Sequence, residues 1–354
     1  MAKPQSEPAE VATDGASSQP APRPTHPLDY LAERYPSGGA DGGYQLVVNA
    51  GTLQSVSYEL GYGVELRRAA SNEHPELRFL VRYYHPTKAQ RQHPWETRIE
   101  VTRDGDPNTQ WFEFHPLGEE NFRYCVLAYA GRSNYAVNEI AQASILSTAP
   151  EFELGVSLGF GEIFHCGSGG LSIEDFRKRV AFDDSAFDAV TDAGINDLKS
   201  LLPAFFALPQ DDVLRRAIGD YIALRTLPHT PLKVLGLFAL LESILTHKPR
   251  DTDPYQAVGR QVKAKMQLLD HRFKRPANYG ASRSRYSDVL LKLWSALYDV
   301  RSTIAHGSPL DFTQGIAAKL GSVDVVHAIV RDVLRSLLRQ MLEEPQLLKD
   351  LKNC

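Results

Sequence analysis

An arginine and a histidine with four residues between them close a long apolar-periodic stretch near the end of the chain, at Arg301 and His306. A histidine titrates close to neutral pH and can accept or give a proton, and a guanidinium neutralises charge that grows on phosphoryl oxygens. These residue types suit RNA cleavage without a metal, in which the 2′-hydroxyl attacks its own phosphate and leaves a 2′,3′-cyclic product. Arg301 and His306 are therefore the candidate catalytic residues.

A helix predicted over residues 287–305 must position the arginine. Its apolar residues recur at spacings of three and four, which places Arg301 on or beside the core-facing stripe. Residues five apart on an unbroken helix point about 140° away from each other, so Arg301 and His306 converge only if the helix ends between them. Gly307 and Pro309 predict such an ending, because glycine tolerates the left-handed cap conformation and proline cannot continue a helix.

Glu242 lies on the apolar stripe of another predicted helix, over residues 232–247. Since either charge alone is costly to bury, Glu242 and Arg301 are expected to pair. Two interpretations remain open: a buried ion pair that only sets helix register, or a catalytic site in which Glu242 supports Arg301. Tyr298 and Asp299 are further polar candidates for orienting the site.

Two segments resemble the HEPN superfamily, most closely its Apea-like branch: Leu240-Leu241-Glu242-Ser243-Ile244-Leu245 and Tyr298-Asp-Val-Arg-Ser-Thr-Ile-Ala-His-Gly307. The resemblance covers roughly residues 206–342. It implies a helical bundle that forms a homodimer, in which two copies of the motif face one shared cleft. In many active members the residue after the arginine is Asn, Asp or His, whereas here it is Ser302, which can still form hydrogen bonds as a supporting residue.

The resemblance implies a metal-independent endoribonuclease of the kind used in toxin or antiviral defence, with the N-terminal part as sensor or regulator. The alternative from another class is a catalytically inactive module that dimerises and binds RNA, a nucleotide or a protein partner. A purely structural dimerisation domain ranks third. No cofactor or metal is expected in any of these.

Charge is distributed unevenly along the chain. Residues 206–354 hold 22 lysines and arginines against 15 acidic residues, whereas residues 1–205 hold 17 against 28. Basic residues are densest in residues 260–285, where the only acid is Asp270. Such a cluster attracts phosphates and releases counterions, although charged faces are more often merely solvated. The predicted RNA-binding residues are Lys263, Lys265, Arg272, Lys274, Arg275, Arg283 and Arg285.

The pattern of the chain predicts an α+β fold in four parts. Residues 1–40 are rich in Pro, Ala, Ser and Gly and are expected to form a disordered tail. Residues 41–165 contain short alternating runs that predict a mostly antiparallel sheet, a sandwich or a barrel. Residues 166–205 form a transition with two predicted helices, and residues 206–345 form the HEPN-like bundle, with helices expected over residues 211–227, 232–247, 255–273, 287–305 and 323–342.

The predicted strands include one over residues 77–84, beside others that begin near Tyr44, Ser55, Thr97, Trp111, Phe122 and Phe152. Three scattered cysteines favour a reducing compartment, and neither a secretory signal nor an apolar run of membrane-spanning length is present. A cytoplasmic protein without membrane contact is therefore expected.

Overall fold

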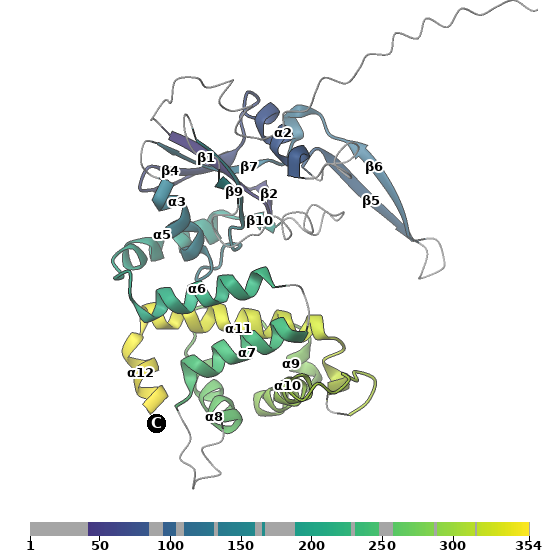
Figure 1. Cartoon of the computed structure of the whole chain (residues 1–354), viewed down its shortest axis with the longest axis vertical. Coiled ribbons are helices and arrows are strands. Elements are labelled where there is room, and N and C mark those ends of the chain that lie inside the picture. The colour runs from purple at the N-terminus through teal and green to yellow at the C-terminus, as the bar shows by residue number, and fades with distance from the viewer. Residues whose placement is uncertain are drawn as a thin grey trace, which may run out of the picture.

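The computed structural model describes residues 42–84, 95–103, 110–130, 134–159, 165–166, 188–227, 231–247, 258–286, 289–315 and 317–353. It has an α+β fold, with a sheet in the N-terminal part and helices in the C-terminal part (Figure 1). The predicted tail of residues 1–40 and the predicted helix of residues 172–180 lie outside the described residues.

The main sheet has six strands in the order β3-β4-β7-β1-β8-β9, and every neighbouring pair is antiparallel. Its central strands contain small and apolar residues that are buried on both faces, and β1 is buried along its whole length. The strands are β1 (Gly42–Val47), β3 (Ser57–Gly61), β4 (Val64–Arg68), β7 (Cys125–Ala130), β8 (Leu154–Gly159) and β9 (His165–Cys166).

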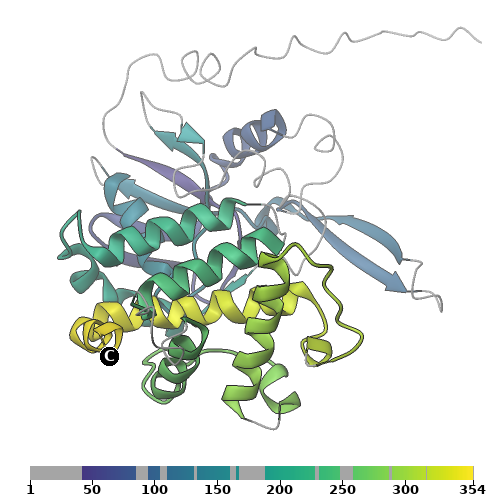
Figure 2. The same cartoon turned by 60° about the horizontal axis from the view of Figure 1, so that its bottom comes forward.

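Two further strand pairs lie beside this sheet. Strand β2 (Ala50–Leu53) pairs in parallel with β10 (Asp188–Val190), which ties the segment before the bundle to the N-terminal part. Strands β5 (Thr97–Arg103) and β6 (Gln110–Pro116) form an antiparallel hairpin. In two views that differ by 60° the hairpin projects away from the body of the molecule (Figures 1 and 2).

One face of the sheet packs on α2 (His74–Tyr84) and on Trp95, Phe122 and Tyr124. The prediction of a strand over residues 77–84 was wrong. The aromatic and branched residues of this run matched strand propensity, but Pro75 and Glu76 stand in the first turn of a helix, where both residue types are favoured. The fully buried Leu77 then anchors the helix to the sheet.

Helices α3 (Asn134–Ser144) and α5 (Asp192–Phe206) cover the other face. The described part of the N-terminal region is therefore built on one antiparallel main sheet flanked by helices. The expectation of a mostly antiparallel sheet is confirmed, whereas the alternatives of a sandwich or a barrel were wrong. The physical reason is that the face left by β1, β7 and β8 is already buried by α3 and α5, so no second sheet is required to cover it.

The predicted helices of the bundle are confirmed, with ends within three residues of those expected. The helices are α6 (Val213–Thr226), α7 (Pro231–Leu245), α8 (Val258–Asp270), α10 (Leu290–Ala305) and α11 (Val323–Glu343), joined by the short α9 (Ser282–Arg285) and followed by α12 (Pro345–Asn353). Side chains of Thr191, Asp212 and Ser322 accept backbone N–H bonds at the starts of α5, α6 and α11. Short 3-10 turns in the described part of the chain include Glu119–Asn121 and Ala317–Lys319.

The larger of two hydrophobic cores among the described residues runs without a break from the sheet through α3 and α5 into the bundle. It includes Leu127 on β7, Leu198 on α5 and Leu334 on α11, all with no exposed area. Residues 188–206, predicted as part of a transition, belong to this packed body. Among the described residues, no helix combines the length and the apolar character that crossing a bilayer requires.

Candidate functional site

Helix α10 carries Arg301, His306 directly follows its last residue, and its C-terminus has the geometry of a Schellman motif. The amide of Ser308 donates to the carbonyl of Thr303, and the amide of Gly307 donates to the carbonyl of Ile304 (both 3.0 Å). Gly307 has a φ of 67°, which favours glycine at this position. The helical ending expected from Gly307 is therefore present.

Arg301 is fixed by Glu242 of α7 through two hydrogen bonds. Its Nε donates to Oε1 and its Nη2 donates to Oε2, each at 3.1 Å. The side chain of Arg301 is 32% exposed and that of Glu242 is 14% exposed, so the pair lies at the edge of the core. The expected pairing is confirmed. It engages Nε and Nη2 of the guanidinium, and no group in the described part of the chain forms a hydrogen bond with Nη1.

The surroundings of this pair are aromatic. One turn before each charged residue, the rings of Phe238 and Tyr298 meet edge to face with 5.4 Å between their centroids. Burial and the negative charge of Glu242 raise the pKa of the Tyr298 hydroxyl. Tyr298 therefore stays protonated at neutral pH, and it supports the pair by packing and as a neutral neighbour of Glu242.

His306 lies one residue beyond α10 but still follows the helical path. Its amide donates to the carbonyl of Ser302 at 3.0 Å, and its φ and ψ are −87° and 1°. Helix α10 ends at Ala305, between the two residues as expected, but this ending does not turn His306 away from the helical path and so does not by itself bring Arg301 and His306 together. Their side chains project about 140° apart around the helix axis.

The face of α10 that carries His306 also carries Asp299 and Ser302, at helical spacings of three and four. All three side chains are exposed. Among the described residues, none forms a hydrogen bond with the imidazole of His306. The chain therefore presents two separate chemical groups, a fixed guanidinium on one side of α10 and an accessible imidazole on another.

The predicted RNA-binding residues divide into two groups. Lys265 and Arg275 are buried: Lys265 Nζ donates to the carbonyl of Leu245, and Arg275 pairs with Asp332 and donates to the carbonyl of Ser147. Their assignment to an RNA surface was wrong, because both charges serve the packing of the fold.

The other five predicted RNA-binding residues reach the surface to different extents. Lys263 is half-buried and Lys274 is exposed. Arg272 is exposed but pairs with Glu344 at 2.9 Å, and Arg283 pairs with Asp270 at 3.1 Å. Arg285 is exposed and donates to the carbonyl of Lys319. A basic surface remains, with part of its charge already offset by acidic partners.

A second charged site, which the sequence had not indicated, surrounds Glu151 between α3 and β8. This carboxylate has no exposed area and contacts Arg225 of α6 and Arg331 and Arg335 of α11 at 2.9–3.3 Å. Tyr221 also donates to it at 2.7 Å. The only visible signal was the pair of arginines four residues apart on the apolar helix of residues 323–342.

The pKa values in this cluster follow from its charges. Burial alone would raise the pKa of Glu151, but the three arginines and the Tyr221 hydroxyl outweigh it and hold that pKa well below its usual range. The charge of Glu151 in turn raises the pKa of Arg331. Glu151 and Arg331 are thus both charged, and the cluster joins the N-terminal part to the bundle.

The chain matches no protein-family model, no curated protein and no solved structure. The chemistry of the two charged sites is therefore the basis for assigning a function.

Proposed function

We propose that the helical part is a metal-independent endoribonuclease of HEPN type whose catalytic site is completed by a second copy of the chain. One observation carries the proposal: α10 holds a fixed guanidinium and an accessible imidazole that point in different directions. A single chain cannot bring these groups to one phosphate, whereas a two-fold pairing along α10 can place Arg301 of one copy beside His306 of the other.

The residues have distinct roles in this reaction. His306 removes the proton from the ribose 2′-hydroxyl, the 2′-oxygen attacks phosphorus, and the bond from phosphorus to the 5′-oxygen breaks. An imidazolium then protonates the leaving 5′-oxygen. Arg301 stabilises the charge on the phosphoryl oxygens with its free Nη1, while Glu242 keeps the guanidinium in place.

Asp299 and Ser302 complete the site as exposed groups on the His306 face of α10. In this arrangement they orient the imidazole or the ribose. The product is a 2′,3′-cyclic phosphate, and DNA is refractory because it lacks the attacking hydroxyl. The N-terminal sheet acts as sensor or regulator, and the enzyme works in the cytoplasm in toxin or antiviral defence.

The most informative experiment incubates purified protein with RNA in EDTA. Wild type is expected to cleave RNA but not DNA, and His306→Ala is expected to lose cleavage. The matched control is His271→Ala, which removes another exposed histidine and is expected to keep full activity. No cleavage by wild type, or cleavage that persists in His306→Ala, would reject the nuclease.

A mixing experiment tests the shared site directly. Arg301→Lys and His306→Ala are each expected to be inactive as pure dimers. Mixed and allowed to exchange, they form heterodimers that keep one intact site, and about a quarter of wild-type activity returns. If the mixture stays inactive although the chains exchange, both residues act within one chain or not at all.

The alternative is a catalytically inactive module that dimerises and binds RNA. The observation in its favour is that the charge of Arg301 is already offset by Glu242. This function predicts RNA binding that weakens steeply with salt, together with unchanged RNA after long incubation.

A further inference from the structure

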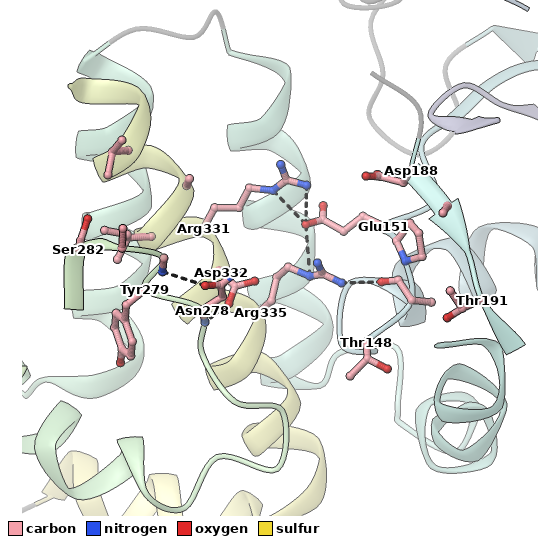
Figure 3. Close-up of a pocket in the computed structure, with 18 of the residues that line it drawn as sticks. Thr148, Glu151, Asp188, Thr191, Asn278, Tyr279, Ser282, Arg331, Asp332 and Arg335 are labelled. Atoms are coloured by element: carbon pink, nitrogen blue, oxygen red, sulfur yellow. Dashed lines mark hydrogen bonds and ion pairs between the residues drawn. The ribbon is translucent and has the colours of Figure 1, made fainter. Parts of the chain in front are cut away.

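A cavity of about 710 Å³ lies between the N-terminal part and the bundle (Figure 3). One wall is the loop of residues 148–151 with the end of β10, and the other is the loop of residues 278–282 with the exposed side of α11. Its volume falls within the range of small-molecule sites, and boundaries between structural units are preferred places for them.

The cavity contains Arg331 and Arg335, which are four residues apart on α11 and therefore neighbours on one helix face. Arg331 donates from Nε (3.0 Å) and Nη2 (2.9 Å) to Oε1 of Glu151. Arg335 uses Nε and Nη2 for backbone carbonyls such as that of Ala149. Figure 3 shows both guanidinium groups directed toward the loop that carries Glu151.

Each of the two arginines keeps one unused nitrogen. Within the part of the chain that the structure describes, Nη1 of Arg331 and Nη1 of Arg335 have no hydrogen-bond partner. The side chain of Arg331 is 38% exposed. Guanidinium donors of this kind form charge-assisted bonds with phosphate oxygens.

The acidic residues of the cavity do not cancel this preference. Glu151 already pairs with three arginines, of which Arg225 does not line the cavity. Asp332 is bound by Arg275 and by the amide of Asn278. Glu151 and Asp332 are thus neutralised by their own partners.

Asp188 also lines the cavity, accepts a hydrogen bond from the side-chain amide of Asn49 and has no cationic partner among the described residues. Arg285 lines the cavity together with Arg331 and Arg335, so the unused donors still favour an anion.

Apart from Asp188 and Arg285, the rest of the wall is uncharged. Val325, Ala328 and Ile329 of α11 face Pro150 across the cavity. Such a surface accommodates a ring. The Thr148 hydroxyl, which donates to Asp197, can still accept a hydrogen bond from the ring's polar edge, and the side-chain NH2 of Asn278 can donate one. The ligand that fits both halves has a phosphate at one end and a ring body at the other.

We propose that this cavity binds a phosphorylated small molecule of nucleotide size, with Arg331 as the principal phosphate ligand. Since Arg331 and Arg335 also hold Glu151, the bound phosphate adds a contact at the junction of the two parts. The proposal is independent of RNA cleavage, because the cavity shares no residue with the Arg301 and His306 site.

Calorimetric titration of the full chain with AMP, ATP, adenosine and inorganic phosphate tests the proposal. AMP or ATP is expected to bind at least tenfold more tightly than adenosine or phosphate alone. Arg331→Gln is expected to weaken nucleotide binding at least tenfold, whereas Arg216→Gln, which changes an exposed arginine of α6, leaves it unchanged.

A second variant tests the cavity without changing Arg331, in case Arg331→Gln loses binding because it misfolds. Ala328→Trp fills the cavity from an exposed position and is expected to abolish binding without disturbing the core. Equal nucleotide binding by wild type and Ala328→Trp would overturn the proposal, as would the absence of binding by AMP and ATP at millimolar concentration.

Discussion

The carboxylate sites of Glu151 and Glu242 both join helices to other parts of the protein, and they differ in how many arginines surround the carboxylate. Glu151 is fully buried and is surrounded by Arg225, Arg331 and Arg335, while Glu242 is partly exposed and holds Arg301 alone. The first joins the N-terminal part to the bundle, and the second joins α7 to α10. The Glu151 site therefore holds two parts of the protein together, whereas the Glu242 site leaves the guanidinium of Arg301 partly accessible.

The two sites differ in how many arginines each carboxylate binds and in how exposed those arginines are. Three cations around one buried carboxylate produce a strong local contact whose removal exposes several uncompensated charges. The ion pair of Glu242 and Arg301 lies at the edge of the core. Its two hydrogen bonds contribute little to stability, but they fix the direction of the guanidinium. Loss of stability is therefore expected at Glu151 and loss of function at Glu242.

The largest effect is expected for Glu151→Gln. This change removes the counter-charge of the largely buried Arg225 and Arg335 and of the partly exposed Arg331, and it should lower the free energy of unfolding by about 3–5 kcal/mol. Urea denaturation followed by circular dichroism measures the change. Glu343→Gln, which removes a partner of Arg339 at a 23% exposed side chain, serves as control and should cost less than about 1 kcal/mol. Equal stabilities for the two variants would remove the distinction.

The same cluster predicts a pH dependence. Because the pKa of Glu151 is lowered in the folded state, its contribution is complete above the unfolded pKa of about 4.3 and is lost as pH falls from there toward the folded pKa. The difference between wild type and Glu151→Gln should be constant from about pH 5 to 8 and shrink below about pH 4. Denaturation at stepped pH values measures it, and a difference that already shrinks between pH 7 and 6 would contradict the assignment.

The two sites also differ in how well the sequence revealed them. Glu242 and Arg301 were recognisable because each interrupts an apolar stripe at helical spacing, which predicts a partner for a half-buried charge. Glu151 could not be linked to its arginines, because they lie 74 to 184 residues away and no local spacing joins them. The density of basic residues in 260–285 predicted an RNA surface that was too large for the same reason. The sequence does not show that the side chains of Lys265 and Arg275 are buried.

Helices and strands were predicted with similar limits. The bundle helices were recovered because periods of three and four persist over several turns in α7, α10 and α11. Residues 77–84 were misassigned because a short run of aromatic and branched residues fits either structure, and α3 carried no expectation at all. The end of α10 was predicted only in part. Gly307 correctly indicated where the helix ends, but the sequence did not show that the backbone of His306 still follows the helical path.

The smallest effect on stability is expected from breaking the Glu242 and Arg301 pair. A double-mutant cycle with Glu242→Gln, Arg301→Gln and both together should give a coupling energy of about 0.5–1 kcal/mol, because the guanidinium is one-third exposed. The proposed enzyme adds a contrast, since Glu242→Gln should still reduce RNA cleavage more than tenfold by releasing Arg301 from its fixed direction.

The cycle made of Glu343→Gln and Arg339→Gln on α11 provides a matched pair at 3.1 Å. Its coupling energy should be similar, but its loss should leave cleavage unchanged, because Arg339 and Glu343 lie on another helix from Arg301 and His306. A coupling energy above about 3 kcal/mol for Glu242 and Arg301 would place that pair with Glu151 as a buried anchor. It would then favour the interpretation in which the pair only sets helix register.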